Sequence, residues 1–125
     1  YVAGAFEYVA TALDLAPPVG CNILVTSTVP RGAGVSSSSA LVVASCLAAR
    51  DAQAGSKPMS LLDVCCQAEW HYSGVPGGIM DQFASLHGTK DAAIVLDCRT
   101  RRIARSVRLD GVDVVLINTN VKHDL

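Results

Sequence analysis

Glycines and serine hydroxyls gather in residues 30–45, PRGAGVSSSSALVVAS. A β-branched run, CNILVTSTV, comes before this stretch and an alanine-rich apolar run follows it, which favours the order strand, glycine-rich turn, helix. The first N–H groups of a helix have no partner inside the helix, and the helix dipole adds partial positive charge there. Because glycines also let the backbone approach a ligand closely, the stretch is typical of a phosphate-binding turn.

A plainer explanation of the same stretch stays open, namely a serine N-cap on a buried helix with glycines serving the turn. Two other phosphate or acyl-transfer motifs are excluded. No lysine follows the glycines, as a Walker-type P-loop requires, and the nucleophile-elbow pattern G-x-S-x-G does not occur. The stretch alone does not decide between a phosphate cradle and a helix cap.

Two carboxylates in the segment AEWHYSGVPGGIMDQFAS, residues 68–85, suggest further chemistry. Glu69 is one of only two glutamates in the chain, and Asp81 follows a Gly-Gly turn at the start of an expected helix. Each also has a simple structural explanation, a solvated helix face for Glu69 and a favourable helix dipole for Asp81. Phosphoryl transfer, however, requires a phosphate cradle, Mg²⁺ on hard oxygen ligands and a group that accepts the proton of the attacking hydroxyl. Ser38 and Glu69 are candidate Mg²⁺ ligands, and Asp81 is the candidate proton acceptor.

The elements that must position these side chains follow from hydrophobic periodicity and from glycine and proline breaks. Helices are expected over residues 2–14, 37–53, 60–72 and 79–86. Strands are expected over residues 21–29, 92–97, 103–107 and 112–118. A capping box, Ser60-Leu61-Leu62-Asp63, predicts where the third helix begins. The mixed order of helices and strands predicts an α+β fold.

The composition narrows the class of protein. The chain has 125 residues, half of them hydrophobic, with a net charge of −1, which fits one modest domain and gives no indication of a nucleic-acid partner. No apolar run reaches the length of a membrane span, and no signal peptide is visible. The first and last residues fall within or just after expected elements, so we expect an internal portion of a longer protein.

Cysteine and histidine usage indicates reduced thiols and no metal centre built from cysteine and histidine. Five cysteines, an odd number without a C-x-x-C pair, suggest a cytoplasmic protein, and the three histidines are far apart.

The basic run at residues 98–108, with five of the ten basic residues, is better explained as the solvent face of a hairpin than as an anion patch. Trp70 and Tyr72 read better as packing residues than as a nucleotide-base platform. Asn118 and Asn120 are only weak candidates for contact with a sugar.

Two segments together resemble a known family. PRGAGVSSSSA is similar to the P-x-G-x-G-L-S-S-S-A motif of the GHMP kinases, and GGIMDQFAS is similar to the C-G-I-M-D-Q segment of the galactokinases within them. AIVLDCR and VVLINTNVKHDL also resemble galactokinase segments in the same order. The resemblance covers essentially the whole chain. It implies the N-terminal GHMP kinase domain, an α+β fold of the ribosomal-protein-S5-domain-2-like type, with a second domain beginning near residues 110–125.

The resemblance also implies roles for individual residues. In that family the glycine-serine segment wraps the phosphates of ATP, which implies this role for Gly32, Ala33, Gly34, Val35, Ser36, Ser37 and Ser38. It implies that Ser38 and Glu69 bind Mg²⁺. It further implies that Asp81 is the catalytic residue and contacts the substrate, and that Gly78 lies against the sugar.

The chain departs from the family pattern at three positions. Val35 stands in place of leucine, Ser39 in place of alanine, and Gly77 in place of the cysteine beside the sugar. The family's sugar-recognition segment G-E-H-T-D-Y does not occur in this sequence. Gly77 leaves the identity of the sugar open.

The implied activity is phosphorylation of α-D-galactose by ATP to give galactose 1-phosphate, in a monomeric cytoplasmic enzyme with no nucleic-acid or membrane partner. Two alternatives remain. One is a kinase of another sugar, such as L-arabinose or N-acetylgalactosamine. The other is a non-catalytic sensor that binds ATP and galactose. The 125 residues alone are expected to be inactive.

Overall fold

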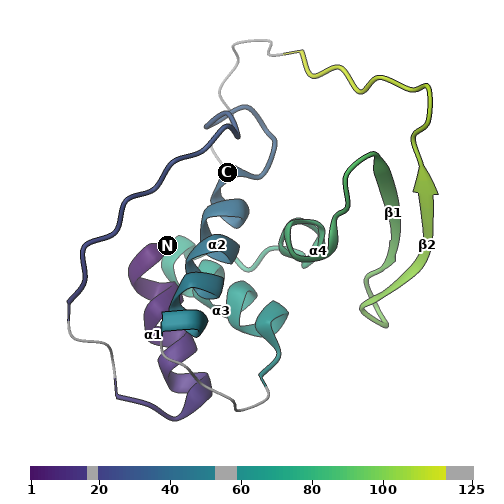
Figure 1. Cartoon of the computed structure of the whole chain (residues 1–125). Coiled ribbons are helices and arrows are strands. Elements are labelled where there is room, and N and C mark those ends of the chain that lie inside the picture. Colours follow the sequence, from purple (N-terminus) through teal and green to yellow (C-terminus); the bar gives the residue numbers. More distant parts are fainter. Residues whose placement is uncertain (17–19, 53–58, 118–125) are drawn as a thin grey trace.

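Helices dominate the described part of the chain, which comprises residues 1–16, 20–52 and 59–117 of a computed structural model (Figure 1). In chain order the elements are α1 (Val2–Leu13), α2 (Ser37–Ala52), α3 (Leu61–Ser73), α4 (Met80–His87), β1 (Ala92–Asp97) and β2 (Arg102–Arg108). The α+β class expected from the sequence is confirmed. None of the helices in these residues combines the length and hydropathy that crossing a membrane requires.

The core lies between α1, α2 and α3, which pack against one another, while α4 packs on α2 and α3. The largest fully buried side chains are Val9, Val42, Cys46 and Cys65. These are small or medium-sized side chains, so the three helices approach closely. One close approach is at Gly4, where an added Cβ would clash with the ring of Tyr72. Tyr72 therefore packs against α1, as the sequence predicts for it.

Three of the cysteines act as small apolar core residues. Cys46, Cys65 and Cys66 are buried, whereas Cys21 and Cys98 are exposed, and all five thiols are free. The hydrogen bond with the Cys46 thiol and burial raise the pKa of Cys65, and burial raises the pKa of Cys66 to about 11. These two thiols therefore stay protonated at neutral pH, which suits an apolar core.

Helix α3 begins where the capping box predicts. Ser60 is its N-cap, and the Ser60 hydroxyl accepts a hydrogen bond from the backbone N–H of Asp63 at 3.4 Å. At the other end, Gly74 adopts φ 71° and its N–H bonds to the carbonyl of Trp70, closing the last turn. The cap thus sets the start of the helix that carries Glu69.

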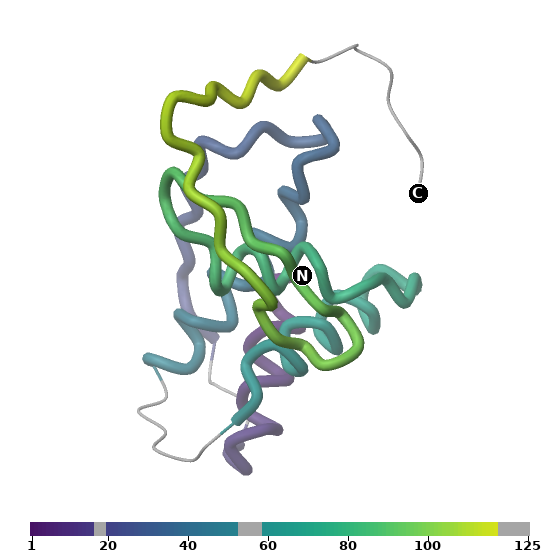
Figure 2. Tube along the Cα trace, turned by 90° about the vertical axis from the view of Figure 1, so that its right-hand side faces the viewer, coloured from purple at the N-terminus to yellow at the C-terminus, as the bar shows by residue number. Residues whose placement is uncertain are grey.

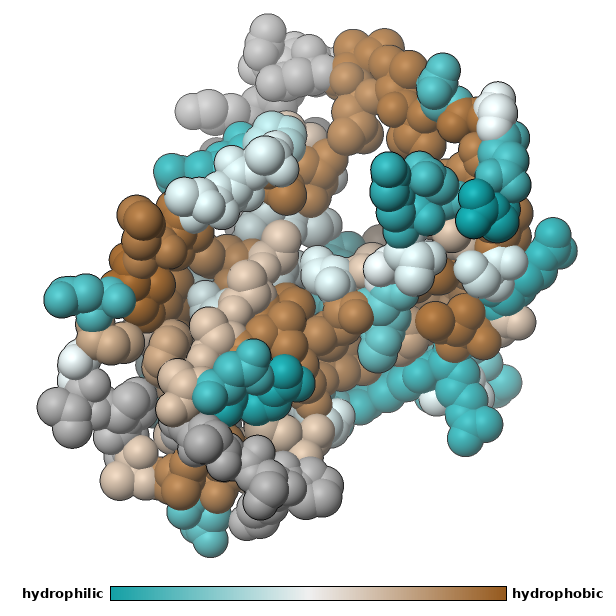
Figure 3. Space-filling view, viewed as in Figure 1, coloured by the Kyte–Doolittle hydropathy of each residue, from teal (hydrophilic) through white to brown (hydrophobic). Residues whose placement is uncertain are grey.

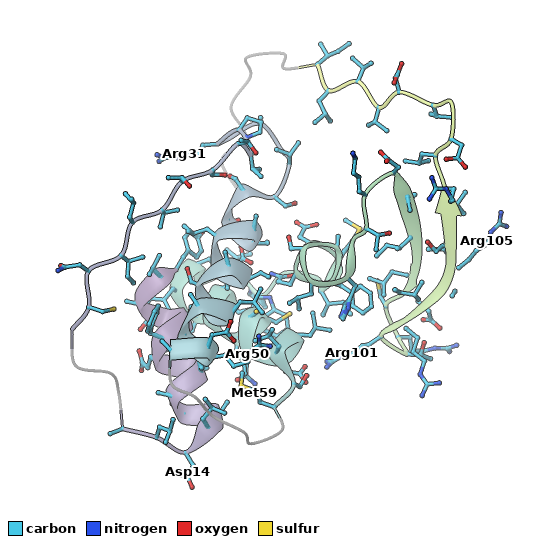
Figure 4. All side chains as sticks on the ribbon, viewed as in Figure 1. Asp14, Arg31, Arg50, Met59, Arg101 and Arg105 are labelled. Carbon is cyan, nitrogen blue, oxygen red and sulfur yellow. The ribbon has the colours of Figure 1, made fainter. Side chains whose placement is uncertain are left out.

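Strands β1 and β2 form an antiparallel hairpin, with Ala92 opposite Arg108 and Asp97 opposite Arg102. The predicted hairpin around residues 98–108 is confirmed. Arg101 reaches from its turn toward α3 and pairs with Asp63, whereas Arg105 points away from the helices (Figure 4).

Two of the four predicted strands are not formed in the described residues. Residues 21–29 and 112–117 are extended but pair with no strand there, and most of their large apolar side chains are exposed. Sequence patterning detects the β-branched run correctly, but a strand also requires a partner for its backbone, and the described chain supplies none. Residue 118, like Asn120, lies outside the described residues. In both views, residues 112–117 run past the end of the molecule at which α2 begins (Figures 1 and 2).

Candidate active site

The glycine loop before α2 owes its shape to backbone conformation. Gly32 and Gly34 have φ values of 68° and 71°, and Ser36 also lies in the left-handed region at φ 54°. Nothing lies within 4 Å of a Cβ placed on Gly34, so glycine is favoured there by its φ value rather than by crowding. The Ser36 carbonyl accepts the N–H of Ala40 at 3.0 Å. The N–H groups of the three serines that open α2 precede the first intrahelical bond, as an anion-binding helix end requires.

A cavity of about 560 Å³ lies beside this helix start, and we call it the carboxylate cavity. Its lining residues come from the N-terminus, from α2, from α3, from the turn into α4 and from the first turn of α4. They are Tyr1, Ser38, Ser39, Glu69, Trp70, Tyr72, Ser73, Val75, Gly77, Gly78, Asp81 and Gln82. The structure therefore brings four of the residues singled out from the sequence, Ser38, Glu69, Gly78 and Asp81, to one hollow.

A second cavity, of about 650 Å³, also borders the first turn of α2, and we call it the loop cavity. Its lining is mixed: residues 25–29 contribute two valines together with Thr26 and Ser27, and α2 contributes apolar side chains and the hydroxyls of Ser37 and Ser38. Arg31 also lines it. Tyr1 and Ser38 line both cavities, so the two cavities adjoin at these residues.

The five other residues predicted to wrap phosphate, Gly32, Ala33, Gly34, Val35 and Ser36, line neither cavity. They form the turn that leads into α2. The structure thus separates the predicted segment into a shaping part, residues 32–36, and a part that faces the cavities, Ser37 and Ser38.

Glu69 is held by two hydrogen bonds to the same carboxylate oxygen. The Ser39 hydroxyl donates to Oε2 at 2.8 Å, and the Gln82 amide Nε2 donates to the same Oε2 at 2.5 Å. Sequence reasoning did not assign a role to either donor. Ser39 could have been found as the serine that replaces alanine in the motif, and Gln82 as the residue directly after Asp81.

Asp81 and Gly78 flank the turn that leads into α4. Asp81 is half-buried in the first turn of that helix. A Cβ on Gly78 would meet nothing within 4 Å, so this position faces open space. A Cβ on Gly77 would lie 3.8 Å from the indole Nε1 of Trp70, so a side chain there would share the cavity wall with Trp70.

The donors in the carboxylate cavity fit one kind of metal ion. Among the described residues, no group of three or more His, Cys, Asp or Glu side chains could enclose a metal. Mg²⁺ does not need such a cage, because it binds through one or two protein oxygens plus phosphate and water. The hydroxyl of Ser38 and the carboxylate of Glu69 supply oxygens of that type in the lining of one cavity.

Comparison with known proteins decides the family. A family model described as the GHMP kinases N terminal domain matches residues 1–89, a range that contains the glycine loop and all residues of the carboxylate cavity. The chain belongs to the GHMP kinase family. The resemblance seen in the two motifs is therefore confirmed, and the match fits the expected N-terminal domain. A second domain near residues 110–125 stays a prediction.

Several curated relatives of this GHMP kinase chain are galactokinases. The galactokinase of Thermotoga petrophila is 43% identical over 83% of the chain, that of Homo sapiens 39% identical over the whole chain, and that of Actinobacillus pleuropneumoniae serotype 3 37% identical over the whole chain. The chain covers 30%, 31% and 33% of these relatives, so it spans about a third of their length.

Proposed function

We propose that the protein containing this sequence is an ATP-dependent sugar 1-kinase that phosphorylates the anomeric hydroxyl of α-D-galactose, giving galactose 1-phosphate and ADP. The galactokinase names of its relatives support the substrate. The observation that carries the proposal is the carboxylate cavity, in which Ser38, Glu69, Asp81 and Gly78 meet from three separate segments of the chain. We also propose a cytoplasmic location, since five free thiols suit a reducing compartment. A monomer is part of the same proposal.

In this proposal each residue has a defined task. The anomeric oxygen attacks the γ-phosphorus, the bond to the β–γ bridging oxygen breaks, and its electron pair leaves with ADP. The Asp81 carboxylate accepts the hydroxyl proton. The N–H groups of Ser37 and Ser38 bind phosphate oxygens at the helix start. Ser38 and Glu69 would hold Mg²⁺, which supplies positive charge against the phosphates when bound.

The test is sugar-dependent ADP release by the full-length protein, with galactose, L-arabinose, N-acetylgalactosamine or no sugar. Asp81→Asn keeps the shape of the side chain and removes the proton acceptor, so we expect kcat to fall by at least about 100-fold while ATP binding is retained. Asp51→Asn is the matched control, because Asp51 is exposed at the end of α2 and lines neither cavity.

Each outcome is informative. Release with galactose that is lost in Asp81→Asn supports both the reaction and the role of Asp81. Release with another sugar keeps the kinase and changes its substrate. ATP binding without release by any sugar would contradict the kinase and favour a sensor. Turnover within tenfold of the wild type in Asp81→Asn would contradict the role of Asp81.

A further inference from the structure

The carboxylate of Glu69 is the meeting point of three helices. Glu69 lies on α3, Ser39 on α2 and Gln82 on α4, and both donors bind the single oxygen Oε2. Each donor residue is only 3% exposed. A buried hydroxyl and a buried amide on one carboxylate oxygen restrict a side chain that would otherwise sample several rotamers.

The two donors leave the other oxygen available. Within the described residues no hydrogen bond reaches Oε1 of Glu69, although Glu69 lines the carboxylate cavity. The orientation of the Gln82 amide follows from the charge of Glu69. Its Nε2 faces the carboxylate, while its buried Oε1 has no partner among the described residues. The reverse orientation would set two oxygens against each other, so the carboxylate decides which end of the amide faces it.

We propose that Ser39 and Gln82 are positioning residues which fix Glu69 through Oε2 and so present Oε1 to a divalent cation bound with nucleotide. The inference rests on the proposed function, because that function makes Glu69 a cation ligand. It adds two residues that act through Glu69 rather than on the cation. Residues that orient a metal ligand in this way commonly change metal affinity about tenfold or more when they are removed.

The readout is nucleotide binding rather than turnover. The dissociation constant of ADP is measured by calorimetry on the full-length protein, once with Mg²⁺ and once with a chelator, and the ratio of the two constants gives the tightening due to the metal. We expect Ser39→Ala to reduce this ratio by about tenfold while the constant without metal stays unchanged. The change also restores the alanine that the family motif usually has at this position.

Ser45→Ala is the matched control. Ser45 lies on the same helix and is 7% exposed, but its hydroxyl donates to the carbonyl of Leu41 and it lines neither cavity. We expect this variant to keep the full metal effect, whatever its melting temperature. Gln82→Met removes the second donor from a different helix with little change in volume, so a folding defect in one test variant leaves the other to decide.

Glu69→Gln separates this inference from the proposed function. If Glu69→Gln abolishes the metal effect but Ser39→Ala and Gln82→Met both keep it within twofold, the positioning role is wrong and the ligand assignment stands. If Glu69→Gln itself leaves the metal effect unchanged, the assignment of Glu69 as a ligand is wrong and the inference is overturned with it.

Discussion

At the scale of single residues, Gly78 is the position where the cavity wall leaves room for a ligand. Its Cβ would meet nothing within 4 Å, and its φ value lies outside the left-handed range, so alanine there strains neither packing nor backbone. Any harm done by a side chain at this position must therefore come from contact with something that occupies the cavity.

We predict that Gly78→Ala folds normally and raises the KM for the sugar by about tenfold or more, because the added methyl group takes space in the substrate pocket. Gly20→Ala is the control, since Gly20 also has open space around its Cβ but lines neither cavity. Melting temperatures and steady-state kinetics of both full-length variants give the answer. An unchanged KM in Gly78→Ala would mean that the sugar does not lie against this residue.

At the scale of elements, caps, turns and hydrophobic alternation predicted the helices and the hairpin. The missing strand pairing within the described residues and the hydrogen bonds to Glu69 were not predicted, because they depend on residues far apart in the sequence. Ser60 placed the start of α3, and strand β1 was predicted with its exact bounds, because caps, turns and alternation act within a few residues. The strand expected at residues 21–29 depends on a partner that no local pattern reveals. The bonds from Ser39 and Gln82 to Glu69 join residues 30 and 13 positions apart, and only the packing of α2, α3 and α4 brings them together.

The link between α3 and the hairpin makes a prediction about pH. The Ser60 hydroxyl, with help from Arg101, holds the pKa of Asp63 below its usual value. A carboxyl group whose pKa is lower in the folded state stabilises the fold above its unfolded pKa of about 3.9, and this stabilisation is lost as the pH falls through the folded pKa. We therefore expect Asp63→Asn to flatten the fall in unfolding free energy between pH 5 and pH 2, while lowering stability at pH 7.

Urea unfolding of the wild type and Asp63→Asn across this pH range measures the difference. Because Asp63 is 43% exposed, solvent screens the interaction, and the change in slope is expected to be small. Asp51→Asn, on the exposed end of α2, controls for the loss of a carboxylate as such. If the unfolding free energy of wild type and of Asp63→Asn falls equally with pH, Asp63 does not stabilise the fold in the way we predict.

At the scale of the whole molecule, the two extended segments expose apolar side chains on both of their sides. Leu24 is 91% exposed, and Val114, Val115, Leu116 and Ile117 are between 71% and 83% exposed. Neighbouring side chains of an extended chain point in opposite directions, so exposure of four in a row means that neither side is covered. Figure 3 shows the apolar surface along the segment that follows β2 and along the segment before the glycine loop. Exposed apolar surface of this kind marks an interface.

We predict opposite effects of one double substitution in two settings. In the 125-residue chain alone, Leu24→Lys with Leu116→Lys should reduce self-association and the binding of a dye that reports exposed apolar surface. The reason is that the two lysines place charge on exposed apolar segments. In the full-length protein the same pair should lower the melting temperature. The galactokinases that the sequence matches are about three times as long, and we expect the corresponding further residues to cover these segments. Sedimentation of the short chain and thermal unfolding of the long one provide the two measurements. Thr26→Lys with Asp113→Lys serves as the control, because it adds a positive charge to the first segment and reverses the charge of the second without removing a large apolar side chain. A full-length protein whose melting temperature is unaffected by the double substitution would contradict the prediction, since it would show that these segments remain exposed there as well.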